Sequence, residues 1–354
     1  MRIRFVTSTP LDISRGSGTF VGISALAQAL RQRGVSVELL TPSFSFPIYT
    51  LQRILFNETL RFRRLPPRDV TIGFDMDGYT LARRSPGPHI ASIKGVIADE
   101  MRFERGFTKA TMRLQAACER AHVAAADLVI TTSPYSAERI QELYHLPQPP
   151  HVVPELIDLT AWNSQLLSVP ETVEKNKFIV LCVCRFYRRK RVDLLLGSAA
   201  RLRSKLDGLE IRIVGGGPEH ARLKKIWKKE RLEGIVTWLE NISHTELLRE
   251  YKQCSVFCLP SVQEGFGIVF LEAMASGKPI IATRAGPMPE VVPHALLVEP
   301  DSEEALAAAI ERLYHDATLR SNLGSAGAQF VQQFDAPLVS RALLREIASL
   351  TDFQ

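Results

Sequence analysis

Long apolar segments are missing from this 354-residue sequence, which contains no run of 18 apolar residues. A helix that crosses a bilayer needs about 20 such residues, so we expect no transmembrane helix. The apolar part of the first strand, which starts at Ile3, is also too short for a secretory signal peptide. We therefore predict a cytoplasmic protein, which could also act at the inner face of the membrane.

Cysteine is scarce and odd in number, with five residues in the chain. Cys182, Cys184, Cys254 and Cys258 lie in apolar, strand-like runs, which favours buried thiols in a reducing compartment over a disulfide framework. No histidine or second cysteine pair stands near Cys182 and Cys184. The sequence therefore predicts no metal site at these thiols.

The sequence also lacks a concentrated basic stripe with interleaved aromatic residues, which nucleic-acid modules normally show. Its 44 basic and 38 acidic residues give a net charge of +6. This modest excess suits an anionic ligand or an anionic membrane surface. We predict no nucleic-acid partner.

Strand patterns such as Val70 to Phe74 and Val236 to Leu239 alternate with helical patterns, among them a long one from about Asp99 to Ala126. This alternation along the whole chain indicates parallel α/β units. The chain is 45% hydrophobic and long enough for two cores. We predict two doubly wound, Rossmann-like domains that face each other across a cleft. The expected boundaries are residues 1–157 plus about 335–354 for an N-terminal domain, 158–176 for a linker, and 177–334 for a C-terminal domain.

Two glutamates bracket a glycine-rich turn after the short apolar run that ends at Leu259. Glu264 precedes Gly265 and Gly267, and a helix is expected to start near Gly267. The N–H groups at a helix start attract anions, and glycine lets a phosphate or a sugar hydroxyl approach the backbone. Glu272 follows on the same helix, where its carboxylate could accept hydrogen bonds from ribose hydroxyls.

Basic residues follow the predicted strand 178–184 directly. Arginine can bind two phosphate oxygens and lysine supplies a compact charge, so Arg185 and Lys190 could neutralise a leaving diphosphate. We interpret Arg188, Arg189 and Arg191 as a solvated loop.

A second junction of strand, glycines and helix lies at residues 214–219, with Gly216 in the middle of a glycine triplet. It matches a dinucleotide fingerprint only loosely, because His220 stands where the third glycine should be. The sequence therefore does not favour NAD.

Together these motifs resemble the retaining glycosyltransferases of family 4 (glycosyl transferases group 1). The motifs are Arg185-x4-Lys190, the triplet at Gly215 to Gly217, Glu264-Gly265-Phe266-Gly267 with Glu272, and Ala285-Gly286-Pro287-Met288-Pro289-Glu290. The resemblance implies the GT-B fold and metal-independent transfer from a nucleotide-diphosphate sugar, with no cofactor. It also implies a front-face mechanism, in which the departing phosphate oxygen helps to deprotonate the acceptor.

The resemblance also implies roles for the two domains: the acceptor side for residues 1–157 plus about 335–354, and nucleotide-sugar binding for residues 177–334. It further implies roles for individual residues. Arg185, Lys190 and Glu264 would be catalytic, and Glu272 would hold the nucleotide ribose. The implied donor-binding set is Gly16, Gly18, Lys94, Arg185, Lys190, Gly216, Glu264, Gly265, Phe266, Gly267, Ile268 and Glu272.

The N-terminal half departs from the family pattern at one predicted strand end. Many members carry histidine near the donor sugar where this chain has Lys94, which could contact phosphate or sugar instead. Asp75 and Asp77 match the Asp-x-Asp pattern that binds metal in glycosyltransferases of the other major fold. Here we expect no metal, and hypothesise that one of them contacts the acceptor or the donor sugar.

Apolar and basic residues are interleaved from Phe44 to Arg68. Such a segment could contact an anionic membrane, although a core helix with an arginine-rich outer face is the simpler interpretation.

The function that these patterns favour is retaining transfer of a sugar to a glycan, lipid-linked or small-molecule acceptor. The alternatives are a sugar-nucleotide epimerase on the same fold and a non-catalytic nucleotide-sugar-binding subunit.

Overall fold

The computed structural model describes residues 1–9, 18–44, 46, 48–84, 87–170 and 177–351, and the chain forms two compact units. Unit 1 comprises Met1–Leu156 with Ala336–Gln354, and unit 2 comprises Ile157–Asp335. Each unit contains a six-stranded sheet whose paired strands run parallel. The predicted pair of Rossmann-like α/β units is thus confirmed.

The sheet of unit 1 has the order β2-β1-β3-β4-β5-β6. Every residue of the two central strands β3 and β4 is buried, as expected for a parallel sheet that is covered on both faces. The elements are β1 (Arg2–Val6), α1 (Gly18–Gln32), β2 (Ser36–Leu40), α2 (Tyr49–Phe62), β3 (Val70–Phe74), β4 (His89–Ile93), α3 (Ile97–Glu100), η2 (Met101–Phe103), α4 (Gly106–Val123), β5 (Leu128–Thr131), α5 (Pro134–Tyr144), β6 (His151–Val152) and α14 (Ala336–Thr351).

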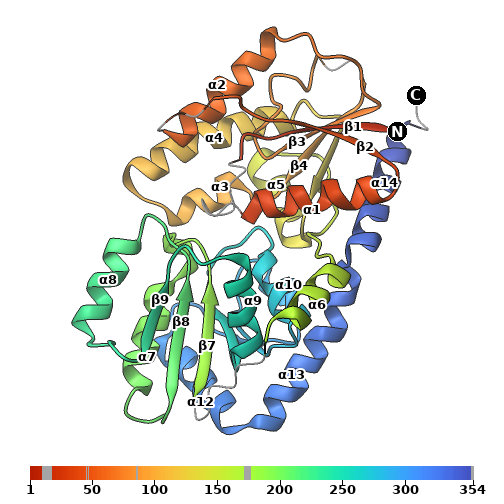
Figure 1. Ribbon diagram of the computed structural model, residues 1–354. Helices are drawn as coiled ribbons and strands as arrows, with labels where there is room; N and C mark the ends of the chain where they lie inside the picture. The colour runs from red at the N-terminus through yellow and green to blue at the C-terminus, as the bar shows by residue number, and fades with distance from the viewer. Residues whose placement is uncertain (10–17, 45, 47, 85–86, 171–176, 352–354) are drawn as a thin grey trace. The chain divides into compact units, whose positions relative to one another are not determined.

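The last helix, α14, packs in unit 1 although it follows unit 2 in the sequence (Figure 1). Val339, Leu343 and Ile347 are one turn apart and share the buried core of β1 and α1. Arg33 adds a polar contact, since its Nε donates to the Ser340 hydroxyl at 2.9 Å. The apolar face of α14 is therefore part of the unit 1 core.

The sheet of unit 2 has the order β12-β11-β10-β7-β8-β9, and Figure 1 shows β7, β8 and β9 side by side. The elements are α6 (Leu159–Ser168), β7 (Phe178–Val183), η3 (Arg188–Lys190), α7 (Val192–Leu202), β8 (Leu209–Val214), α8 (His220–Lys229), β9 (Val236–Leu239), α9 (His244–Gln253), β10 (Val256–Leu259), α10 (Ile268–Ala275), β11 (Ile280–Thr283), α11 (Met288–Val291), β12 (Leu296–Val298), α12 (Glu303–His315), α13 (Ala317–Phe330) and η4 (Val331–Phe334).

The strand order of each sheet reverses at one point. In unit 2 the chain builds outward from β7 to β9 and then returns to place β10 beside β7. In unit 1 the reversal lies between β1 and β3. Ligands of open parallel sheets bind beyond the carboxyl ends of the strands at such a reversal, so each unit has one expected binding edge.

Part of the predicted linker is a helix. The first part of 158–176 forms α6, which Asp158 caps by accepting from the Ala161 N–H at 2.9 Å. Trp162 is buried in the core of unit 2, so α6 belongs to that unit. Residues 171–176 of the expected linker lie outside the described residues.

The predicted long helix from about Asp99 to Ala126 is also interrupted, into α3, η2 and α4. The interruption is at Glu104 and Arg105, which are extended, and at Gly106, whose φ is +57°. Within the described part of the chain, none of the helices is long and apolar enough to span a bilayer.

Candidate active site

The binding edge of unit 2 is formed by the segments that follow β7, β8 and β10. These strands are neighbours in the sheet and run parallel, so their carboxyl ends meet at one edge. The segment after β10 is joined to η3 by a hydrogen bond from the Val262 N–H to the Arg189 carbonyl at 2.8 Å. Sequence motifs separated by about 80 residues are thereby brought to one place.

Lys190 and Glu264 are in direct contact at this edge. The Lys190 ammonium lies 2.5 Å from Glu264 Oε2, and the side chains are 13% and 7% exposed. Glu264 Oε1 accepts a hydrogen bond from the Ser261 hydroxyl at 2.6 Å. The structure thus brings together two of the three residues predicted to be catalytic.

Arg185, the third residue predicted to be catalytic, lies two residues after the end of β7 and is half-buried. Among the described residues its guanidinium has no ion-pair partner, unlike Lys190. Because a partly buried guanidinium without a carboxylate favours an anionic ligand, Arg185 is available to bind a phosphate.

The start of α10 lies between Glu264 and Glu272. Gly267 is the N-cap residue with a φ of +91°, and no side chain caps the helix. A Cβ on Gly267 would lie 2.6 Å from the Phe270 ring, so only glycine fits there. The first N–H groups of a helix have no acceptor within the helix and suit an anion.

The residues around Gly267 divide between core and surface. Phe266 is buried and its ring meets that of Phe334 edge to face at 5.4 Å. Gly265 and Ile268 are only partly buried. Phe266 can therefore contribute its backbone to a ligand, while its side chain supports the core.

Glu272 lies on α10 and is partly buried. Burial raises the pKa of its carboxyl to about 7, against a hydrogen bond from the Tyr251 hydroxyl at 2.7 Å that lowers it. A carboxyl group with this pKa changes charge near neutral pH.

The glycine triplet encloses the backbone after β7. Gly215 has a φ of +131°, and a Cβ there would overlap the carbonyl oxygen of Cys184. A Cβ on Gly216 would meet nothing within 4 Å, and its carbonyl accepts from the Phe186 N–H at 2.9 Å. Packing thus requires Gly215, while Gly216 borders open space.

The predicted solvated loop needs one correction. Arg189 is buried, with its guanidinium 4.7 Å from the centre of the Tyr187 ring, because the chain turns inward at η3. Arg188 pairs with Glu219 at 3.5 Å, and Arg191 pairs with Asp193 at 3.3 Å and with Asp301.

Asp77 lies at the binding edge of unit 1, but both of its carboxylate oxygens already accept hydrogen bonds within that unit. It is 0% exposed and accepts from the Ser8 N–H at 2.7 Å, from Asn57 Nδ2 at 2.9 Å and from the Arg53 guanidinium at 3.2 Å. The last of these is a buried ion pair. Asp77 therefore ties β1 and α2 to the end of β3.

Asp75 is less constrained. Its Oδ1 accepts from the Lys94 N–H at 2.8 Å, and no hydrogen bond to its Oδ2 is present among the described residues. Desolvation raises the pKa of this carboxyl to about 6, although the Arg53 guanidinium lowers it. Of the two aspartates, Asp75 is the one that can accept a hydrogen bond from a ligand hydroxyl.

A pair of buried histidines holds the backbone of Asp75. His122 Nδ1 lies 2.6 Å from the Asp75 carbonyl oxygen and must donate to it, so its Nε2 accepts from His89 Nε2 at 2.8 Å. Desolvation lowers the pKa of both imidazoles. Both rings are therefore neutral, and they fix the turn in which Asp75 has a φ of +54°.

Lys94 follows β4 and forms a buried ion pair with Glu155, with Nζ 3.2 Å from Oε1. The side chains are 6% and 5% exposed. Lys94 is therefore neutralised within unit 1. Gly18, also in this unit, begins α1 and is exposed, whereas Gly16 lies outside the described residues.

Sequence reasoning missed Tyr251, Arg53, Asn57 and His122, which support the predicted residues from helices. Arg53 and Asn57 are four residues apart on α2, so both face Asp77. That four-residue spacing is the sequence signal that could have identified Arg53 and Asn57 as a pair on one helix face. For Tyr251 no local motif indicates its contact with Glu272.

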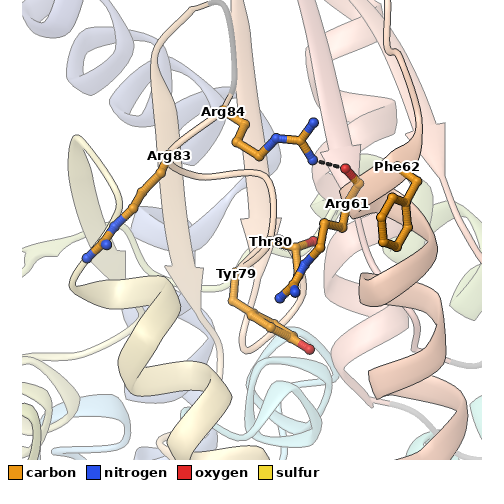
Figure 2. Close-up of a pocket in the computed structure, with 6 residues that line it drawn as sticks. All are labelled: Arg61, Phe62, Tyr79, Thr80, Arg83 and Arg84. Atoms are coloured by element: carbon orange, nitrogen blue, oxygen red, sulfur yellow. Dashed lines mark hydrogen bonds between the residues drawn. The ribbon is translucent and has the colours of Figure 1, made fainter.

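A surface pocket of about 490 Å³ lies on unit 1, at the end of α2 (Figure 2). Arg84 donates to the Arg61 carbonyl at the end of α2, while Arg83 points away from it. The pocket is lined by Arg61, Phe62, Tyr79, Thr80, Arg83 and Arg84.

Two family models match the chain. The Glycosyltransferase Family 4 model matches residues 16–161, and the Glycosyl transferases group 1 model matches residues 165–330. Together they cover most of the sequence. The chain therefore belongs to the group 1 glycosyltransferases of family 4.

Curated relatives match over part of the chain. The GDP-mannose-dependent alpha-(1-6)-phosphatidylinositol monomannoside mannosyltransferase of Mycobacterium tuberculosis is 34% identical over 162 residues, 43% of this chain and 42% of the relative. The D-inositol 3-phosphate glycosyltransferase of Pseudarthrobacter chlorophenolicus is 29% identical, over 58% of this chain and 51% of the relative. The chain thus spans about half the length of the curated relatives it matches.

Solved structures match over nearly the whole chain. Sucrose-phosphate synthase from Thermosynechococcus elongatus has a TM-score of 0.83 at 22% identity and covers 100% of both chains. Anabaena Alr3699/HepE in complex with UDP and glucose has a TM-score of 0.75 at 18% identity, covering 99% of this chain and 100% of that one. These similarities confirm the predicted GT-B fold of two Rossmann-like domains.

Proposed function

We propose that the protein transfers a hexose from a nucleotide-diphosphate sugar to an acceptor, with retention of anomeric configuration. The observation that carries this proposal is the arrangement at the binding edge of unit 2. There Lys190 and Glu264 are in contact, and Arg185 and the uncapped start of α10 follow neighbouring strands. These groups are suited to a sugar diphosphate.

The transfer breaks the bond between the anomeric carbon and the diphosphate oxygen. The acceptor oxygen forms the new bond on the same face of the sugar, and its proton passes to the departing phosphate oxygen. Arg185, Lys190 and the N–H groups of α10 stabilise the charge that develops on the diphosphate. Glu264 holds Lys190 in place and contacts the sugar. No metal or cofactor takes part in this scheme.

The donor test uses a panel of nucleotide sugars. One relative is a GDP-mannose-dependent enzyme, and one structure with a similar fold contains UDP and glucose. GDP-mannose and UDP-glucose are therefore the first donors to test. Binding to the native state raises the melting temperature by mass action. The anomeric configuration of the product is read by NMR. An inverted product would contradict retention, and donor isomerisation without acceptor would favour an epimerase.

The diphosphate role predicts a selective loss. Arg185→Ala and Lys190→Ala should weaken binding of the nucleoside diphosphate by about 10-fold to 100-fold, because each removes a charge-assisted contact. Nucleoside binding should change much less. Arg188→Ala is the matched control, since Arg188 lies in the same segment but pairs with Glu219. Equal losses for nucleoside and diphosphate would contradict the assignment.

We propose a glycan, lipid-linked or small-molecule acceptor and contact between unit 1 and anionic membrane at the end of α2. The support is a cluster of exposed arginines beside Phe62, whose side chain is 83% exposed.

A further inference from the structure

Tyr251 reaches the carboxylate of Glu272 from a different helix. It lies on α9 and is fully buried, and its hydroxyl lies 2.7 Å from Glu272 Oε2. The same hydroxyl is 3.4 Å from the Val269 carbonyl oxygen. No hydrogen bond to Glu272 Oε1 is present among the described residues. One carboxylate oxygen is thus engaged and the other is free for a ligand.

The ring of Tyr251 is held in place on two sides. Trp162 meets it edge to face at 5.6 Å, and Phe257 stacks on it at 5.9 Å. Trp162 also donates from Nε1 to the Ser276 hydroxyl at 3.1 Å, which in turn donates to the Glu272 carbonyl oxygen at 2.8 Å. Helices α6 and α9 therefore fix both the side chain and the backbone of Glu272.

The hydrogen bond also affects the charge of Glu272. Burial favours the neutral carboxyl, whereas a hydroxyl that donates to the carboxylate favours the charged form. Burial and the nearby Glu272 raise the pKa of Tyr251 itself well above its usual value, so the phenol remains a donor throughout the physiological range. Without this donor, the carboxyl would take up a proton at higher pH.

We propose that Tyr251 is the positioning residue of the ribose site: it holds Oε2 of Glu272 so that Oε1 accepts a ribose hydroxyl, and it keeps the carboxylate charged. This inference rests on the proposed function, because it assumes a nucleotide ligand. It follows that nucleotide affinity falls as Glu272 becomes protonated.

Few other ionisable groups surround the pair. Helix α6 and η4 supply none, and Arg320 on α13 donates to the carbonyl of Tyr314. Lys252 and Lys278 donate to backbone carbonyls. The thiols of Cys254, at the end of α9, and Cys182, on β7, act on Tyr251. His244 of α9 packs against the ring of Trp162 at 6.2 Å.

The test compares Tyr251→Phe with the wild type in calorimetric titrations with UDP and GDP between pH 5.5 and 8.5. The ratio of the two proteins' affinities cancels the titration of the diphosphate itself. We expect the nucleotide affinity of Tyr251→Phe to be within about 3-fold of the wild-type affinity at pH 8.5 and roughly 10-fold lower near pH 6.5. The reason is that Glu272 of the variant takes up its proton at a higher pH than Glu272 of the wild type does. A constant ratio at every pH would mean a purely structural role and would overturn the proposal.

Two further variants serve as controls. When both proteins also carry Glu272→Gln, the ratio of the Tyr251→Phe and Tyr251 affinities should no longer depend on pH. Glu272→Gln should also remove the preference of the protein for UDP over 2′-deoxy-UDP. Tyr314→Phe should change neither, because the Tyr314 hydroxyl donates to the Asp207 carbonyl instead. If Glu272→Gln still bound UDP more tightly than 2′-deoxy-UDP to the same degree, the contact between Glu272 and the ribose would be contradicted.

A direct measurement separates this inference from the proposed function. In protein labelled with ¹³C at glutamate carboxyls, the resonance absent from Glu272→Gln belongs to Glu272. Its titration midpoint should rise by roughly one unit or more in Tyr251→Phe. An unchanged midpoint overturns the inference even if nucleotides bind. Failure of the wild type to bind any nucleotide overturns the proposed function and the ribose role with it.

Discussion

Asp75 and Asp77 are two residues apart, yet their carboxylates have different surroundings. Asp77 neutralises the buried Arg53 and accepts from Ser8 and Asn57. Removing one partner of a buried ion pair typically costs about 3–5 kcal/mol. Asp75 instead has one oxygen engaged by the Lys94 N–H and a pKa raised by desolvation. The two residues therefore differ in what their replacement should affect.

Asp75→Asn should lower activity without lowering stability. Asparagine still accepts from the Lys94 N–H and tolerates the positive φ of this position. If Asp75 binds an acceptor or donor-sugar hydroxyl, loss of its charge should lower kcat/KM by about 10-fold to 100-fold. Unchanged kcat/KM would remove this role.

The same variant has a defined pH signature. The pKa of Asp75 is raised from 3.8 to about 6 in the folded protein. The folded state then binds more protons between these values, so this group's contribution to stability is full below about pH 4 and is lost as the pH rises through 6. Relative to the wild type, Asp75→Asn should gain on the order of 2 kcal/mol in unfolding free energy between pH 4 and 7.5. Urea titrations at both pH values measure this difference.

At the scale of elements, the glycine triplet after β8 combines packing with binding. Gly215→Ala should destabilise the protein by roughly 2 kcal/mol or more, because its φ is positive and a Cβ would overlap the Cys184 carbonyl. Gly216→Ala should change stability by less than about 0.5 kcal/mol, since the added carbon meets nothing.

Nucleotide binding should be impaired in Gly216→Ala, the variant whose stability is nearly unchanged. If Gly216 borders the donor phosphates, its Cβ excludes the ligand and the nucleoside diphosphate binds more weakly to a protein of normal stability. Chemical unfolding and calorimetric titration of both variants check this. A Gly216→Ala protein with wild-type affinity would remove Gly216 from the donor site.

The regular elements of this fold were largely predictable from local pattern. Val70–Phe74 and Val236–Leu239 are strands with the predicted bounds, because short runs rich in β-branched and aromatic residues favour strands. Helix α6 was not predicted. Thr160, Asn163 and Ser164 are weak helix formers, and burial of Trp162 against Tyr251 stabilises α6 instead. That contact is invisible in a local window.

The candidate site was predictable only where a motif is contiguous. The spacing of Arg185 and Lys190 and the turn from Glu264 to Gly267 predicted a candidate site, and the structure brings Lys190 and Glu264 into contact there. The ion pair of Lys94 with Glu155 joins positions that are distant in the chain, as does the contact of Tyr251 with Glu272. Such partners depend on the sheet order, which a single sequence does not define.

At the scale of the whole molecule, the +6 charge is not evenly distributed. Around the end of α2, Arg63, Arg64 and Arg83 are exposed and have no ion-pair partner among the described residues, and Phe62 projects beside them. On α8 of unit 2, Lys225 and Lys228 are likewise exposed and have no such partner. Only the first cluster combines positive charge with a large exposed aromatic side chain, as binding at a lipid interface requires.

This difference predicts a selective effect on membrane binding. The wild type should co-sediment with vesicles containing phosphatidylglycerol at low salt, and much less with pure phosphatidylcholine or in 0.5 M salt, because salt screens the attraction. Each basic residue near an anionic surface contributes about 1 kcal/mol, so Arg63→Gln/Arg64→Gln should bind about 30-fold more weakly. Lys225→Gln/Lys228→Gln removes the same charge from unit 2 and should bind nearly as the wild type does. If both double variants lost affinity equally, net charge alone would explain the binding, and the end of α2 would have no special role.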